Sequence, residues 1–375
     1  MANKTWIGGV TAVPMVWKGS ITTTTAGHTY IVTVTDEFGA STAFSYALVA
    51  GDTTVTIAAA SFVTAWNLIA DGIIASFTAS SSVGQVILTQ DTGGIPYTLT
   101  PTGTGTWSGT GNTTAPQSPN DYSIANNWAE GAVPIATDNV FISGTKDILY
   151  GLNQSAVEIG NFTVLPTCTA AIGRPQASLQ IDVANASTAV FGGTGLAYID
   201  VGASAISPRV DRTAFPAAQG AAGLYLAGSA FSTVNILGGV VRMDAGSTWT
   251  TITVYAGATL IVPAGATLTT ITNYGTLTLG AACTTLNNIA GNCVTENSGA
   301  YTTVNCDGGK IVSNSTGTIG TLNSDGGEVD LLQNHTARTI TNLAMRGGKV
   351  RYEPSVVTIT NPITSTVGVE LKSAA

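Results

Sequence analysis

The triplet Thr303-Val304-Asn305 is followed 18 residues later by Thr321-Leu322-Asn323, and the same phrase recurs through the C-terminal half of the chain. Each copy has Thr, a branched aliphatic residue, then Asn or Thr, with the aliphatic residue at 234, 252, 271, 286, 304, 322, 340 and 359. A glycine follows most copies within a few residues. A fixed period that combines a strand-like phrase with a glycine turn is typical of a solenoid. We therefore expect a parallel β-helix with coils of about 18 residues.

The length of the repeat also limits the shape of each coil. Such a coil fits a slim, three-sided cross-section, and its handedness stays open. An alternative is a trimeric prism, in which three chains each contribute one face. In either arrangement, equivalent residues of neighbouring coils stack about 4.8 Å apart along the axis.

Charged residues recur beside the Gly-Gly turns of this ladder. Directly after the turns come Lys310, Glu328 and Lys349, and two positions later come Val312, Asp330 and Arg351. Stacking would place opposite charges side by side, which is favourable, whereas stacked like charges repel. We also expect Asp307 and Asp325 to stack with Arg346, just before the turns. These charges are therefore interpreted as structural neighbours, with a cation site or a catalytic acid pair at Asp307 and Asp325 as a weaker alternative.

Composition excludes several classes of function. Only 9% of the 375 residues are charged, against about 25% in an average soluble protein. The net charge is −8 with 13 Lys and Arg, so neither nucleic acid nor an anionic membrane surface is an expected partner. The sequence contains no run of about 18 apolar residues, so no membrane span is expected. The N-terminus lacks the apolar core of a secretory signal, so we expect synthesis and retention in the cytoplasm.

The first 25 residues are predicted to form an extended apolar arm. Two tryptophans close to a chain end need a surface to bury them, on this chain or on a partner. We interpret the arm as a docking segment with Trp6, Ile7, Val13, Met15, Val16 and Trp17.

Residues 26–101 have the pattern of a small α+β domain. Alternating segments at 30–35 and 44–49 predict strands, and the spacing over 57–73 predicts a helix whose apolar face holds Phe62, Trp66, Leu68, Ile69 and Ile73. Three more strands are expected at 75–79, 85–89 and 97–100.

This stretch resembles a small domain found in structural proteins of tailed bacteriophages. The likeness rests on Gly51-Asp52, on the helix with Trp66 and Ile69, and on the strand-turn-strand of residues 85–100. It covers about one fifth of the chain and implies a component of a virus particle, without its position on that particle.

Between this domain and the regular repeats, the pattern is less uniform. Residues 102–120, rich in Thr, Gly and Ser, are expected to be a linker. Residues 121–142 are expected to open the β-helix (121–360), with Trp128 as its cap, because a solenoid end exposes apolar surface and unpaired strand edges. Irregular coils follow over 143–230 and regular coils over 231–360. We expect a loop at 202–222, which serves as a spacer or as a recognition loop and contains Pro208, Arg209, Asp211, Arg212 and Pro216. Residues 361–375 are expected to cap the end of the β-helix.

No catalytic motif is present in the sequence. The cysteines at 168, 283, 293 and 306 lack zinc-finger spacing and are expected to be buried core residues without disulfides. The two histidines, His28 and His335, stand outside any hydrolase or metalloprotease motif. We therefore expect no enzyme activity, no catalytic residue, no cofactor and no bound metal.

Together these features predict a mainly β protein, with a small N-terminal α+β domain and a C-terminal parallel β-helix. The expected function is a capsid decoration, cement or head-fibre protein, assembled in the host cytoplasm and exposed on the virion. Its expected partners are the major capsid protein or other virion proteins, and further copies of itself in a homotrimer. The alternative is a tail fibre or tailspike that recognises host surface glycans and could cleave them.

Overall fold

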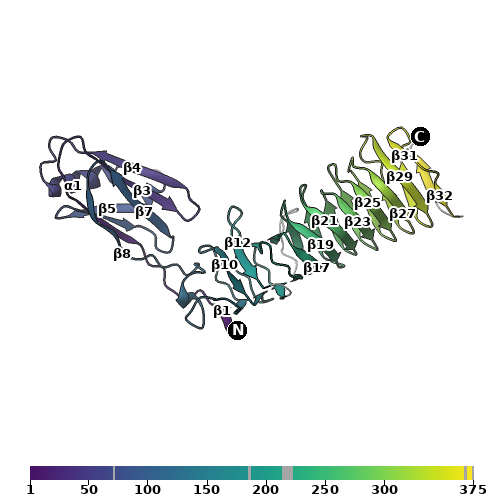
Figure 1. Cartoon of the computed structure of the whole chain (residues 1–375), viewed down its shortest axis with the longest axis horizontal. Helices are drawn as coiled ribbons and strands as arrows, with labels where there is room; N and C mark the ends of the chain where they lie inside the picture. Colours follow the sequence, from purple (N-terminus) through teal and green to yellow (C-terminus); the bar gives the residue numbers. More distant parts are fainter. Residues whose placement is uncertain (71, 185–186, 213–222, 367–369, 374–375) are drawn as a thin grey trace. The chain divides into compact units, whose positions relative to one another are not determined.

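The computed structural model describes the chain apart from residues 71, 185–186, 213–222, 367–369 and 374–375 (Figure 1). It consists of two compact units. One, here called the N-terminal unit, contains Gly8–Val133 and Asp147–Gly151. The other, the solenoid unit, contains Met1–Ile7, Pro134–Lys146 and Leu152–Ala375. The N-terminal unit is therefore larger than the expected domain over 26–101.

The N-terminal unit is built from two antiparallel sheets and one helix. The four-stranded sheet has the order β5 (Phe77–Ser82), β6 (Gln85–Gln90), β2 (Val16–Ile21) and β8 (Trp107–Thr114). The three-stranded sheet has the order β4 (Ser41–Ala47), β3 (Thr29–Asp36) and β7 (Tyr97–Gly103). All the strands expected from residues 30 to 100 are present. A short 3₁₀ turn, η1 (Ile74–Ser76), precedes β5.

Helix α1 (Val55–Trp66) packs on this core with its small and aromatic residues. Thr54 caps the helix, because its hydroxyl accepts a hydrogen bond from the Ile57 amide at 3.2 Å. Ala58, Ala59, Phe62 and Trp66 are buried, as the helical spacing predicts. The helix ends earlier than expected.

The early end of the helix changes the position of two residues. Leu68 and Ile69 lie in the turn after α1, where their side chains are 78% and 40% exposed. The expectation that they share the buried helix face is therefore wrong.

The segment expected to be a linker contains a strand. Residues 107–114 form β8, which pairs with β2 along most of its length. The Trp107 ring contacts Tyr30 and Trp17 edge-on, with centroid distances of 5.0 and 5.7 Å. The many Thr, Gly and Ser residues conceal this strand because its only large apolar anchor is Trp107. The linker prediction for 102–120 is wrong on this point.

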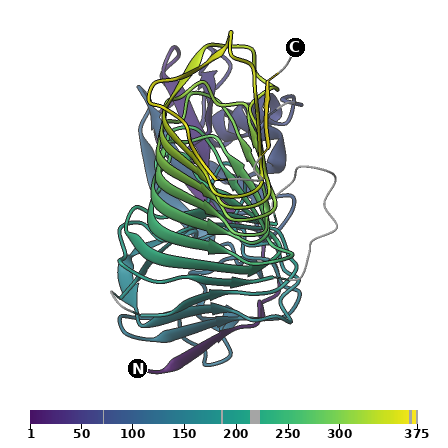
Figure 2. The same cartoon turned by 90° about the vertical axis from the view of Figure 1, so that its right-hand side faces the viewer.

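The solenoid unit consists of about 11 turns, with strands that alternate between two parallel sheets (Figures 1 and 2). The larger sheet has the order β1 (Asn3–Trp6), β9 (Asn139–Ile142), β11 (Asn161–Val164), β13 (Ala189–Phe191), β15 (Arg209–Asp211), β17 (Phe231–Gly238), β19 (Thr248–Val254), β21 (Thr267–Asn273), β23 (Cys283–Asn288), β25 (Tyr301–Cys306), β27 (Ile319–Ser324), β29 (Arg338–Met345) and β31 (Val357–Ile359), and β32 (Thr364–Ser365) pairs with β29.

The smaller sheet has the order β10 (Asn153–Ile159), β12 (Leu179–Val183), β14 (Ala197–Asp200), β16 (Leu224–Ala227), β18 (Val240–Met243), β20 (Thr259–Val262), β22 (Thr276–Leu279), β24 (Asn292–Thr295), β26 (Lys310–Ser313), β28 (Glu328–Asp330), β30 (Lys349–Tyr352) and β33 (Glu370–Ser373).

The repeat phrase sets the register of the larger sheet as expected, with one exception. The aliphatic residues at 234, 252, 271, 286, 304 and 322 stack on one another in that order. The next residue in the stack is Leu343, not Ile340, which lies over Ile319 instead. The path from Asp330 to Ile340 is three residues longer than the equivalent path from Val312 to Ile319, so the phrase at 339–341 is displaced by three positions.

The strands of the coil belong to two parallel sheets in the described residues. A strand of six residues and one of four, joined by a Gly-Gly turn and a longer turn, use the whole repeat. The second glycine of each Gly-Gly turn has a positive φ (66° at Gly309, 67° at Gly327), which favours glycine. Both sheets belong to one chain, so the alternative of a prism with one face from each of three chains is wrong.

The expected docking arm is divided between the two units. Residues 3–6 form β1, which pairs in parallel with β9, and the Trp6 indole donates a hydrogen bond to the Lys146 carbonyl at 2.8 Å. The exposed fractions of Trp6, Met15 and Trp17 are 0%, 0% and 2%. These three side chains are core residues of this chain and are not presented to a partner, which corrects the docking prediction for them.

The other arm residues differ in exposure. Ile7 is 46% exposed, whereas Val13 and Val16 are half-buried. Val16 begins β2, and Val13 forms an isolated bridge with Gln117.

Trp128 does not lie where a solenoid cap was expected. It belongs to the N-terminal unit, packs edge-on against Tyr122 at 4.7 Å, and donates from its indole to the Tyr122 carbonyl. The first position of the larger sheet is occupied by β1, whose backbone pairs with the edge of β9.

Two further segments differ from a simple loop or tail. Within 202–222, residues 209–211 form β15 of the larger sheet, and Arg212 is buried. Pro216 lies outside the described residues. Near the C-terminus, β32 and β33 continue the two ladders by pairing with β29 and β30.

Candidate interaction surfaces

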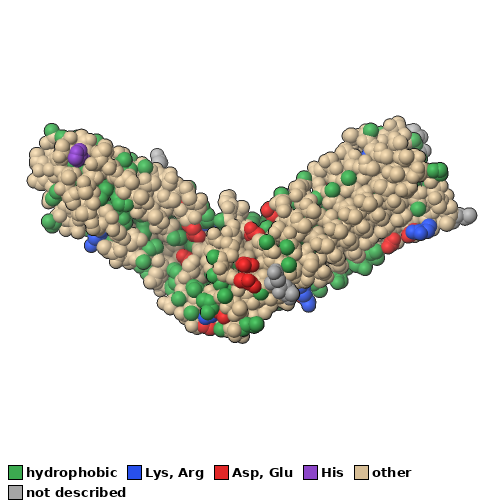
Figure 3. Space-filling model, viewed as in Figure 1, with side chains coloured by type: hydrophobic (Ala, Val, Ile, Leu, Met, Phe, Trp, Pro, Cys, Tyr) green, Lys and Arg blue, Asp and Glu red, His purple; other side chains and the backbone are tan. Residues whose placement is uncertain are grey.

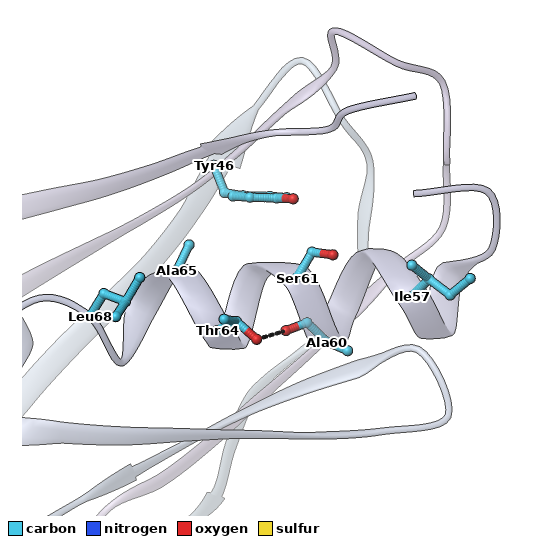
Figure 4. A pocket seen from close by; sticks show the side chains of 7 residues that line it. All are labelled: Tyr46, Ile57, Ala60, Ser61, Thr64, Ala65 and Leu68. Carbon is cyan, nitrogen blue, oxygen red and sulfur yellow. Dashed lines mark hydrogen bonds between the residues drawn. The ribbon is translucent and has the colours of Figure 1, made fainter. Parts of the chain in front are cut away.

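A shallow groove lies on the outer face of α1 in the N-terminal unit (Figure 4). It has a volume of about 440 Å³ and is lined by Tyr46, Ile57, Ala60, Ser61, Thr64, Ala65 and Leu68. Figure 4 shows the Tyr46 ring extending from β4 over the helix, with Ile57 and Leu68 near its ends. The apolar side chains at the two ends are 44% and 78% exposed. Such an exposed apolar patch is a candidate for contact with another protein.

A buried carboxylate fixes one wall of the groove. The Tyr46 hydroxyl donates to Asp52 Oδ2 at 3.0 Å, and the Val49 amide donates to the same oxygen at 2.9 Å. Burial favours a higher pKa for Asp52, but the hydrogen bonds from Val49, Ser61 and Tyr46 outweigh it and lower the pKa. Desolvation and the contact with Asp52 raise the pKa of Tyr46, and the hydrogen bond with Ser61 opposes them.

Asp52→Ala is expected to destabilise the N-terminal unit by about 1–3 kcal/mol at pH 7, because buried donors lose their acceptor. Since the folded pKa is lowered, this carboxylate stabilises the fold above its unfolded pKa of about 3.9 and loses that effect as the pH falls. Urea titrations at pH 7 and pH 3 should therefore show a smaller acid-induced loss in the variant than in the parent. An identical loss in both proteins would contradict this role.

A second candidate surface is a row of turn residues that runs along one edge of the solenoid. Successive coils place Leu237, Tyr255, Tyr274, Ile289, Asp307, Asp325 and Arg346 in equivalent positions. Tyr255 and Tyr274 are 41% and 40% exposed and stack with ring centroids 6.3 Å apart. Figure 3 shows hydrophobic, then acidic, then basic side chains along the lower edge of the solenoid toward its C-terminal end.

The charged residues of the smaller sheet have the register expected from the sequence. Lys310 lies opposite Glu328, which lies opposite Lys349, and Asp330 lies opposite Arg351. Ion pairs join Lys310 to Glu328 at 3.3 Å, Arg351 to Glu328 at 3.5 Å, and Arg351 to Asp330 at 3.2 Å. The pairs made by Glu328 are partly solvated, so each contributes little to stability. Asp330 is buried, and Arg351 neutralises its charge.

The same alignment holds just before the Gly-Gly turns. Arg346 forms a two-pronged contact with Asp325, with N–O distances of 2.7 and 2.9 Å. This contact raises the pKa of Arg346. Asp307 is left with Asp325 as its like-charged neighbour in the row. Within the described chain, no three His, Cys, Asp or Glu side chains gather closely enough to hold a metal ion.

Two arginines inside the solenoid, Arg212 and Arg338, are buried, which is not predicted from the sequence. Arg338 donates to the carbonyls of Ser313 at 2.7 Å and Ser315 at 2.9 Å, and also to that of Leu331. Burial lowers the pKa of Arg338, against a smaller opposing effect of Asp330. Arg212 donates to the carbonyls of Gly192 and Gly195, and burial lowers its pKa to about 10. Both guanidinium groups bind turn carbonyls, which indicates a structural role.

The cysteines are core residues, as expected. Cys168, Cys283, Cys293 and Cys306 are all buried, and none of them forms a disulfide. Burial raises the pKa of Cys283 and of Cys306 to about 11, so these thiols stay protonated at neutral pH.

None of the helices that the structure describes has the length and apolar character needed to cross a bilayer. Comparison of the chain with protein-family models, with curated proteins and with solved structures finds no match. Function must therefore be argued from the surfaces themselves.

Proposed function

We propose that this protein is a non-enzymatic structural component of a virus particle, of the capsid decoration, cement or head-fibre kind. The observation that carries the proposal is a regular β-solenoid whose scarce charges pair with one another along the ladder. In such a shaft, charged side chains of neighbouring coils neutralise one another. A β-solenoid is also compatible with fibre or tailspike-like proteins.

The N-terminal unit supplies the proposed docking surface. Trp6, Met15 and Trp17 are buried, so docking falls instead to the exposed apolar groove on α1. The resemblance of residues 26–101 to a phage structural domain supports the same assignment. Its proposed partner is the major capsid protein or another virion protein. Self-association, which is expected from the sequence as a homotrimer, is part of the same proposal.

Leu68→Glu is expected to reduce incorporation of the protein into particles at least tenfold, because the charge would have to be buried against the partner. The control is Phe38→Glu, at another exposed apolar position, which lies in the turn between β3 and β4. Incorporation is measured by quantifying the protein in purified particles. Normal incorporation of the Leu68 variant, with an unchanged melting temperature, would contradict docking through the groove.

A second function, recognition of host glycans by a tail fibre, is favoured by the exposed Tyr255–Tyr274 pair, which lies in the same row as Asp307 and Asp325. Aromatic rings offer apolar faces to a sugar, and carboxylates accept hydrogen bonds from hydroxyl groups. If this function applies, particles that lack the protein fail to adsorb to the host. Adsorption at the normal rate would favour the decoration role. New reducing ends after incubation with host polysaccharide would instead indicate a hydrolase.

A further inference from the structure

We infer that a second copy of this chain packs face to face on the outer surface of strands β17, β19, β21, β23, β25 and β27. This inference deepens the self-association that is part of the proposed function, and it replaces the expected threefold contact by a twofold one. It rests on the charge, hydrogen bonding and periodicity of this one surface, called here the Thr/Asn face.

The Thr/Asn face carries no charge. The six strands, all within the described residues, contain no Asp, Glu, Lys or Arg. Figure 3 shows the corresponding broad area over these strands without acidic or basic side chains in its centre. The smaller sheet, by contrast, carries Arg242, Lys310, Glu328 and Lys349. Because the chain has a net charge of −8, two copies approach at lowest electrostatic cost through an uncharged surface.

The polar groups of this face tolerate being covered by another copy. The Asn305 amide donates to Asn287 at 2.7 Å, and the Asn323 amide donates to Asn305 at 2.8 Å, so these side chains are already paired along the ladder. The neighbouring row consists of Thr251, Thr270, Thr285, Thr303 and Thr321. A threonine hydroxyl both donates and accepts, so it can pair with its equivalent on a second copy.

Periodicity selects a second copy as the occupant. The rows repeat every coil, about 4.8 Å apart, and only a partner with the same spacing can match them over all six strands. Using about 4.8 Å per strand and about 3.3 Å per residue over five residues, the contact buries about 500 Å² per copy, or about 1,000 Å² in total. That area lies at the small end of specific interfaces, so association should depend on concentration.

One flat surface that packs on a copy of itself closes after two subunits, because the contact is isologous. Thr285 is on β23, near the middle of the face, and therefore lies close to its own equivalent in the pair. Thr278 is a matched control, since it is also a half-buried, outward-facing threonine but belongs to β22 of the other sheet.

The test is sedimentation equilibrium of the full chain over a range of concentrations, for the parent, Thr285→Arg and Thr278→Arg. We expect a monomer–dimer equilibrium in the parent, at least a tenfold weaker one in Thr285→Arg, and no change in Thr278→Arg, with equal melting temperatures. Thr285→Cys should also form a disulfide-linked dimer under mild oxidation, and Thr278→Cys should not.

A parent that stays monomeric at every concentration, or forms a trimer, would overturn the inference. So would equal weakening by both arginine variants. These outcomes can be distinguished from a failure of the proposed function. A monomeric chain that still enters particles would disprove the dimer and leave the virion role intact. Conversely, a dimer that never enters particles would support the pair and remove the virion role.

Discussion

Trp6→Ala is expected to destabilise the solenoid unit by about 3–5 kcal/mol, the usual range for removing a buried tryptophan. The side chain is fully buried, and its indole N–H is bound to the Lys146 carbonyl. Its loss also weakens β1, which occupies the end of the larger sheet and pairs with β9. Chemical denaturation monitored by circular dichroism measures the change.

The control is Ile7→Ala, because Ile7 is the next residue and is 46% exposed. Its expected change is within about 0.5 kcal/mol. Near-equal stabilities of the two variants would show that residues 3–6 do not form part of the solenoid, and would restore the idea of a free docking arm.

Arg338→Met is expected to cost about 3–5 kcal/mol, the usual penalty for removing one partner from a buried charged network. The guanidinium binds the carbonyls of Ser313, Ser315 and Leu331, which a methionine leaves without their donor. The affected turns lie between β26 and β29, so unfolding should begin in the C-terminal coils. Hydrogen exchange of the β29 and β30 amides locates the effect.

Arg242→Met is the matched control, since Arg242 is an exposed residue on the outer row of β18. It removes the same charge from the solenoid without disturbing any buried carbonyl. Similar losses in both variants would mean that net charge, and not the buried hydrogen bonds of Arg338, determines the change.

The regular coils could be predicted from the sequence because the same pattern of residue types recurs in coil after coil. The stacking of Val304 on Leu286 and of Leu322 on Val304 follows from period alone. The pairing of Glu328 with Lys310 follows from the same alignment. The error at Ile340 arose where one turn lengthens, because the phrase recurs there at a displaced position.

The ends of the two units could not be predicted in the same way. Strand β1 pairs with β9, which lies more than a hundred residues further along the chain. No local sequence pattern indicates such a distant contact. Strand β8 has Trp107 as its single large anchor among Thr, Gly and Ser, so composition favours a linker. The groove on α1 was missed because the helix ends at Trp66, which leaves Leu68 exposed.

The central claim is that this protein is a component of the virion surface, and a reconstruction of particles by electron cryomicroscopy tests it most directly. Particles with and without the protein are compared. The account predicts extra density on the outer surface of the particles that contain the protein. Identical maps, with the protein absent from purified particles, would contradict the account.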